Sequence, residues 1–117
     1  DLGGDLLWAR KLDDPVLAST REAFVRKNRE NKNPSRLFAL RYFLDGQVVD
    51  GDLWMLLNSE DEEDGVVLVL DGGTGSLKRR IVLSGLSSVG QFAIDPSRRR
   101  MYVTVPDEAM VVAFSLE

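Results

Sequence analysis

Short apolar runs, separated by clusters of turn-forming residues, make up the chain from residue 37 onward. Runs of about four to eight residues bounded by Gly, Pro, Asp or Ser are typical of the strands of sandwiches, barrels and propellers. The pattern therefore predicts an all-β region of antiparallel strands. The expected strands are residues 37–44, 52–57, 66–70, 77–83, 91–94, 101–105 and 110–116, and Asp45-Gly46 is the turn expected to end the first of them.

The first 36 residues have a different character. Residues 6–12 form a short apolar run that predicts one strand. Asp14 followed by Pro15 predicts the start of a helix, because an N-cap aspartate accepts hydrogen bonds from free N–H groups and proline suits the first helical position. The helix should run from Pro15 to about Arg29, so residues 1–36 are expected to hold a strand and an inserted helix.

The apolar runs repeat along the chain. Residues 52–56 (DLWML) correspond to residues 100–104 (RMYVT) at an offset of 48, and residues 67–70 (VLVL) correspond to residues 111–114 (VVAF) at an offset of 44. Each copy reads as a strand, a turn, an aromatic-bearing strand, an acidic turn and an apolar strand. This period is close to the roughly 40–50 residues of a propeller blade.

The last copy carries a family resemblance. Asp95-Pro96, Tyr102-Val103-Thr104 and Phe114-Ser115-Leu116 resemble the repeat of the YVTN, NHL and YWTD-type β-propellers. The segment from Trp54 through the turn Asp71-Gly72-Gly73-Thr74-Gly75 is similar to the same pattern. The chain departs from it at Val105, where the YVTN form has Asn, so that the turn there is expected to differ.

The resemblance covers residues 37–117 and implies about two propeller-like β repeats, residues 37–83 and 90–117. A closed propeller has about 4–8 four-stranded blades, so these repeats would be a segment of a larger propeller or would assemble with other copies. A small self-contained α+β domain, with one helix packed on a curled antiparallel sheet, is the alternative fold.

The amino-acid composition limits the partners and the kinds of catalytic site that the chain can have. The net charge is −4, from 15 basic and 19 acidic residues, and this argues against a nucleic-acid partner. The chain has no Cys and no His, which excludes disulfides, thiolate nucleophiles and a Ser-His-Asp triad formed within it. No apolar run approaches the roughly 20 residues of a membrane span. We therefore expect a soluble protein without a cofactor, and the compartment stays open.

Two motifs could carry chemistry. Residues 70–76 are glycine-rich and follow a strand, as phosphate-binding loops do, but no helix pattern follows them, so a hairpin turn is the favoured interpretation. Residues 60–64 offer five carboxylates without the alternating spacing of a calcium loop, which favours a solvated acidic turn. The aromatic residues, Trp8 and Trp54 among them, are assigned to the core.

Two basic clusters are the candidate binding residues, while no catalytic and no metal-binding residues are predicted. The clusters are Arg26, Lys27 and Arg29 at the end of the helix and Arg98, Arg99 and Arg100 in a turn. These features predict a non-enzymatic interaction or scaffold module. The expected partner is a protein, the remaining blades of a parent propeller or a second copy. The alternative is a ligand-binding or hydrolytic propeller whose catalytic residues lie outside this chain.

Overall fold

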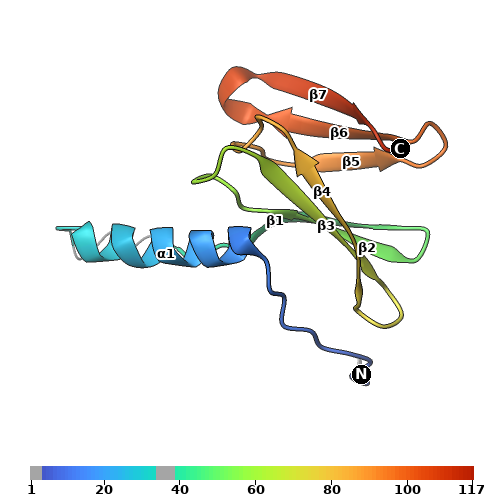
Figure 1. Cartoon of the computed structure of the whole chain (residues 1–117), viewed down its shortest axis with the longest axis horizontal. Coiled ribbons are helices and arrows are strands. Elements are labelled where there is room, and N and C mark those ends of the chain that lie inside the picture. The colour runs from blue at the N-terminus through green and yellow to red at the C-terminus, as the bar shows by residue number, and fades with distance from the viewer. Residues whose placement is uncertain (1–3, 34–38) are drawn as a thin grey trace.

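A computed structural model of the chain describes residues 4–33 and 39–117, which form one helix and two antiparallel sheets (Figure 1). The prediction of a mostly antiparallel β fold with one helix is confirmed, and neither sheet closes on itself within the described residues. The helix is α1 (Pro15–Glu30). The first sheet contains β1 (Phe43–Val49), β2 (Asp52–Leu57), β3 (Gly65–Asp71) and β4 (Leu77–Leu83) in that order. The second contains β5 (Phe92–Asp95), β6 (Arg100–Val105) and β7 (Met110–Ser115), and the 3-10 turn Pro106–Glu108 joins β6 to β7.

Helix α1 begins where the sequence predicts. Asp14 is the N-cap, and its side chain accepts a hydrogen bond of 3.0 Å from the Val16 N–H. Pro15 occupies the first turn, where its missing N–H costs no hydrogen bond. No helix in the described part of the chain is long and apolar enough to cross a membrane.

Two local predictions are wrong. Residues 6–12, predicted as a strand, belong to neither a helix nor a strand, because no strand among residues 4–33 and 39–117 pairs with them. Asp45-Gly46, predicted as a turn, lies inside β1 and pairs with β2. The turn falls instead at Asp50 and Gly51, whose φ angles of 50° and 82° are left-handed, as a tight two-residue hairpin requires. The first expected strand, residues 37–44, is therefore misplaced: residues 39–42 are not in a strand and β1 begins at Phe43, while residues 37 and 38 lie outside the described residues.

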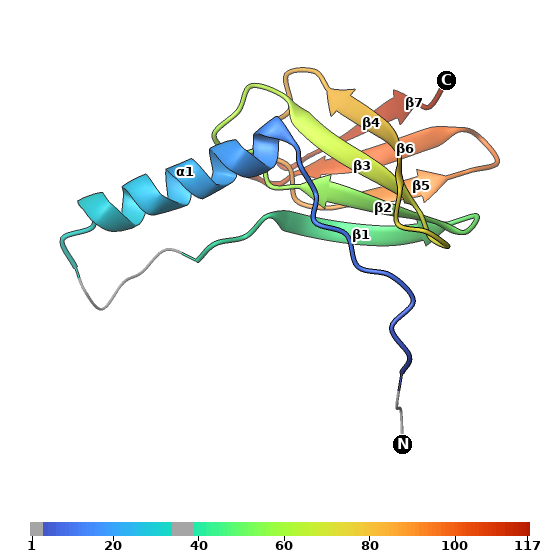
Figure 2. The same ribbon diagram turned by 60° about the horizontal axis from the view of Figure 1, so that its bottom comes forward.

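Side chains on both faces of the first sheet are buried by packing. Because side chains alternate along a strand, Trp54, Leu56, Val67 and Val69 face the second sheet and form the main core with Met101 and Val103. Leu57, Val66 and Leu68 face the other way and pack against Val16, Leu12 and Leu17. Burial on both faces explains why β3 is an uninterrupted apolar run. The second sheet therefore packs on one face of the first sheet, and the start of α1 lies against the other face, while the rest of α1 projects beyond the sheet (Figures 1 and 2).

Side chains of β1 join the two sheets at the edge of β5. The Phe92 N–H donates to Asp45 Oδ2 and the Ile94 N–H donates to Gln47 Oε1, each at 3.1 Å. Both contacts link residues 47 positions apart. These two N–H groups point away from β6, so the β1 side chains satisfy donors that the second sheet leaves free.

We expect Gln47→Ala to lower the free energy of unfolding by about 1–2 kcal/mol, because the partly buried Ile94 N–H loses its acceptor. Urea unfolding measures the change, and amide exchange should accelerate at Ile94. Gln91→Ala is the matched control, since the side chain of Gln91 is exposed. Equal effects of the two substitutions would contradict the joining role of Gln47.

Candidate functional site

The face of the first sheet that looks away from the second sheet carries a groove of about 540 Å³, which we call the outer groove. Its floor is formed by Leu53 and Met55 of β2 and Leu70 of β3. One wall is the start of α1, and another is the extended segment of residues 8–14, which we call the strap. Tyr42 and Phe43 close the side next to β1.

A glycine of β1 lies beside the floor of the groove. Gly46 of β1 is the direct partner of Met55, and directly paired residues of an antiparallel sheet place their side chains on the same face. A Cβ at Gly46 would meet only the Trp54 carbonyl oxygen within 4 Å, at 3.6 Å. The space above Met55 is therefore left unfilled by β1.

The strap is fixed to the turn between β3 and β4. Trp8 Nε1 donates to the Gly72 carbonyl at 2.9 Å, and Arg10 Nε donates to the Thr74 carbonyl at 3.3 Å. The Trp8 ring lies against Gly75, where a Cβ would come within 2.4 Å of it. The sequence predicts core positions for both tryptophans, but only Trp54 belongs to the core. No signal in residues 8–14 indicates this contact, since it joins segments 64 residues apart.

An ion pair closes the other end of the strap. Arg80 Nε of β4 donates to Asp14 Oδ2 at 2.7 Å, and Arg80 Nη2 lies 3.4 Å from Asp14 Oδ1. Burial of Asp14 by itself would raise the pKa of its carboxyl. The hydrogen bonds from Arg80 and the Val16 N–H and the charge of Arg80 outweigh that effect, so the pKa lies below its ordinary value of 3.8. Asp14 is therefore an ionised anchor between α1, the strap and β4.

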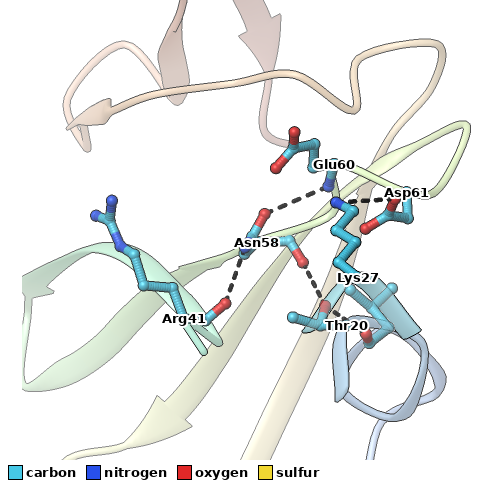
Figure 3. Close-up of polar contacts among 7 residues, drawn as sticks. Thr20, Lys27, Arg41, Asn58, Glu60 and Asp61 are labelled. Atoms are coloured by element: carbon cyan, nitrogen blue, oxygen red, sulfur yellow. Dashed lines mark hydrogen bonds and ion pairs between the residues drawn. The ribbon is translucent and has the colours of Figure 1, made fainter. Parts of the chain in front are cut away.

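A second polar cluster, centred on Asn58, ties α1 to the loop between β2 and β3 (Figure 3). The Thr20 hydroxyl lies 2.8 Å from the Asn58 carbonyl oxygen. Asn58 Nδ2 donates to the Arg41 carbonyl at 2.9 Å, and Asn58 Oδ1 lies 3.4 Å from the Glu60 N–H. Next to it, Lys27 Nζ pairs with Asp61 Oδ1 at 3.5 Å. This cluster positions the helix that forms one wall of the outer groove.

The predicted basic residues lie in two separate places. Arg26, Lys27 and Arg29 are on the last turns of α1, and Arg98, Arg99 and Arg100 are at the turn between β5 and β6. These two segments are at opposite ends of the molecule in both views (Figures 1 and 2). The structure therefore does not bring the two clusters together into one surface.

Some of the basic side chains already have acidic partners. Lys27 pairs with Asp61, and Arg98 Nη1 lies 3.4 Å from Asp95 Oδ2. The Ser97 hydroxyl, more than any other group, lowers the pKa of Asp95, which keeps that carboxylate charged beside Arg98. Binding by any of the six basic residues stays a prediction.

The two motifs singled out by sequence have structural settings. Residues 72–76 connect β3 to β4 as a hairpin turn, in which Asp71 Oδ1 accepts hydrogen bonds from the Gly73 and Thr74 N–H groups at 2.7 and 3.2 Å. The hairpin interpretation is confirmed. In the part of the chain that the structure describes, no three acidic side chains gather closely enough to hold a metal ion.

Comparisons of the chain with family models, with curated proteins and with solved structures found no match.

Proposed function

We propose that this chain is a non-enzymatic protein-interaction or scaffold module, a propeller-like segment that pairs with its partner along β7. The main support is the repeated architecture. Strands β1-β2-β3 and β5-β6-β7 have the same antiparallel order, and the two sheets stack with β1 beside β5. In the first sheet β4 pairs with the far edge of β3, whereas no described strand pairs with the far edge of β7.

The free edge of β7 has none of the usual protection against strand pairing. Its sequence, MVVAFS, contains no charge and no proline, and Val111 is 65% exposed. The free edge of β4 carries three consecutive charges, Lys78, Arg79 and Arg80, which discourage the addition of a strand. The contrast favours β7 as the edge that accepts a strand from a partner.

The other side of the two-sheet unit is partly covered. Helix α1 and the strap pack on the outer face of the first sheet, where a further sheet would otherwise lie. This arrangement resembles the capping of a repeat array, in which a terminal element shields one end. Additional sheets, from a parent propeller, another protein or a second copy, would then join from the side of the second sheet.

We expect Val111→Lys to abolish association along β7, because a charge on an unpaired strand disfavours pairing. Size-exclusion light scattering of the 117-residue chain, with and without the substitution, measures the change. Val82→Lys is the matched control, since Val82 is also partly exposed and lies on the already charged β4. Association that survives Val111→Lys, or that both substitutions remove equally, contradicts pairing through β7.

A grafted strand tests the proposal when the wild-type chain is monomeric. A copy of residues 72–83, which includes β4 and its turn, is added after Glu117. If β7 has an edge equivalent to that of β3, the graft should raise the melting temperature by about 5 °C or more and protect the β7 amides from exchange. The control graft carries proline in place of Arg80 and Val82 of the copy. No gain over this control overturns the proposal.

A further inference from the structure

We propose that the outer groove is a binding site for a small amphipathic anion, a molecule with one apolar chain or ring system and one carboxylate-like group. This site lies on the capped face of the first sheet and is independent of the β7 edge. It therefore goes beyond the proposed function and can be tested separately.

The size and lining of the groove suit such a molecule. Its volume of about 540 Å³ lies within the range of about 300–1,000 Å³ in which small-molecule sites fall. The lining is mostly apolar and aromatic: Leu17, Tyr42, Phe43, Leu53, Met55 and Leu70. Such a surface gains free energy by covering an apolar body, whereas a fully polar ligand would lose its hydration without replacement.

The charges at the rim select the sign of the polar group. Three basic side chains, Arg10, Lys11 and Arg21, line the groove and are exposed. Of the two acidic side chains there, Asp14 is already bound to Arg80 and the Val16 N–H, which leaves Asp13 as the only acid facing the three cations. Neither Lys11 nor Arg21 forms an ion pair with any described residue. The net positive rim above an apolar floor is complementary to an amphipathic anion.

The backbone around the groove argues for a small molecule over an added strand. The floor belongs to β2 and β3, and both strands are paired along both edges. They therefore present no free backbone groups to an incoming peptide. The occupant has to be held by side chains, which is the usual way in which apolar pockets hold small ligands.

The first test is calorimetric titration of the full chain with dodecanoate, kept below the concentration at which it forms micelles. We expect saturable binding with one molecule per chain. Dodecyltrimethylammonium, which has the same apolar chain and the opposite charge, should bind at least about tenfold more weakly, because the rim repels it. Equal binding of the two probes would show unspecific adsorption and overturn the proposal.

Two substitutions locate the site. Gly46→Val places a side chain above Met55, where a Cβ has room and the backbone needs no positive φ, so the sheet should remain intact while dodecanoate binding falls about tenfold or more. The double variant Lys11→Glu/Arg21→Glu should weaken dodecanoate roughly fivefold and favour the cationic probe. Its matched control is Arg26→Glu/Lys32→Glu, which changes the net charge equally at exposed positions that do not line the groove.

Each outcome of these experiments either supports or overturns the proposed binding site. Loss of binding in the groove variants, with retention in the control variant, supports the site. Absence of binding to the wild-type chain overturns it, and so does binding that Gly46→Val leaves unchanged. A change in solution mass caused by Gly46→Val, without any probe binding, would assign the groove to a protein partner instead. Because Val111→Lys reports on β7 alone, failure here does not affect the proposed function.

Discussion

Replacing Asp14 with alanine should lower the free energy of unfolding by about 2–4 kcal/mol. Loss of an N-cap acceptor costs about 0.5–2 kcal/mol, and the substitution also leaves Arg80 without its partner. Breaking a fully buried pair costs about 3–5 kcal/mol, but the Arg80 side chain is 38% exposed and regains water, so the cost of the broken pair is smaller here. Urea unfolding monitored by circular dichroism measures the change.

Two further variants separate the roles of Asp14. Asp14→Asn keeps an oxygen that can cap the helix but removes the charge, so its cost should lie well below that of Asp14→Ala. Asp13→Ala is the matched control, because Asp13 is exposed and should change stability by less than about 0.5 kcal/mol. If Asp14→Ala costs no more than Asp13→Ala, the anchor described for the strap and α1 does not exist.

The same ion pair should appear in the pH dependence of stability. The folded-state pKa of Asp14 lies below 3.8, so the unfolded chain takes up a proton more readily than the folded chain. The stabilisation from Asp14 is therefore complete above pH 3.8 and is lost as the pH falls through the lower, folded pKa. Between pH 6 and pH 3 the wild-type chain should lose more stability than Asp14→Asn. Parallel curves for the two proteins would show that Asp14 has no depressed pKa.

Replacing Gly75 with alanine should release the strap and destabilise the chain by about 2–4 kcal/mol. Gly75 has a φ of 77°, a conformation that costs other residues about 1–2 kcal/mol. The added Cβ would also lie 2.4 Å from the Trp8 ring, so the indole has to leave its position. The hydrogen bond from Trp8 Nε1 to Gly72 would then be lost, and one wall of the outer groove with it.

Gly85→Ala is the matched control for Gly75→Ala. Gly85 has a nearly identical φ of 75°, but a Cβ there meets nothing within 4 Å. Gly85→Ala should therefore lower the free energy of unfolding by only about 1–2 kcal/mol, which is the cost of a left-handed backbone conformation for alanine. The indole N–H signal of Trp8 in a ¹⁵N spectrum should move in Gly75→Ala and stay in place in Gly85→Ala. An unchanged Trp8 signal in both variants would contradict the packing of the strap on the turn.

The strands and the helix start could be predicted from sequence because each depends on local chemistry. The run Leu77–Leu83 is a strand at the predicted bounds, and Asp14-Pro15 starts the helix where a cap and a first-turn proline should. The turn predicted at Asp45-Gly46 is wrong because pairing with β2 and the hydrogen bond between Asp45 and β5 stabilise a strand there more than the turn preference of Asp-Gly favours a turn. Tertiary contacts therefore overrode a local signal.

The candidate site could not be predicted in the same way. Its walls meet through contacts such as Trp8 with Gly72 and Asp14 with Arg80, which join residues 64 and 66 positions apart. The open space beside Met55 depends on Gly46, and the pairing of these two residues is visible only once the strand register is known. The sequence predicts binding by charge clusters such as those at Arg26 and Arg98, because clustered charge is visible without knowing which strands are neighbours.

The linkage between β1 and β5 has a consequence for how the chain assembles. In each sheet, all neighbouring strands are consecutive in sequence, so every ladder of backbone hydrogen bonds can form between segments that emerge from the ribosome one after the other. The second sheet is held to the first by apolar packing and two side-chain acceptors, not by a continuous ladder. Local opening can therefore separate the two sheets while each keeps its own ladder of backbone hydrogen bonds.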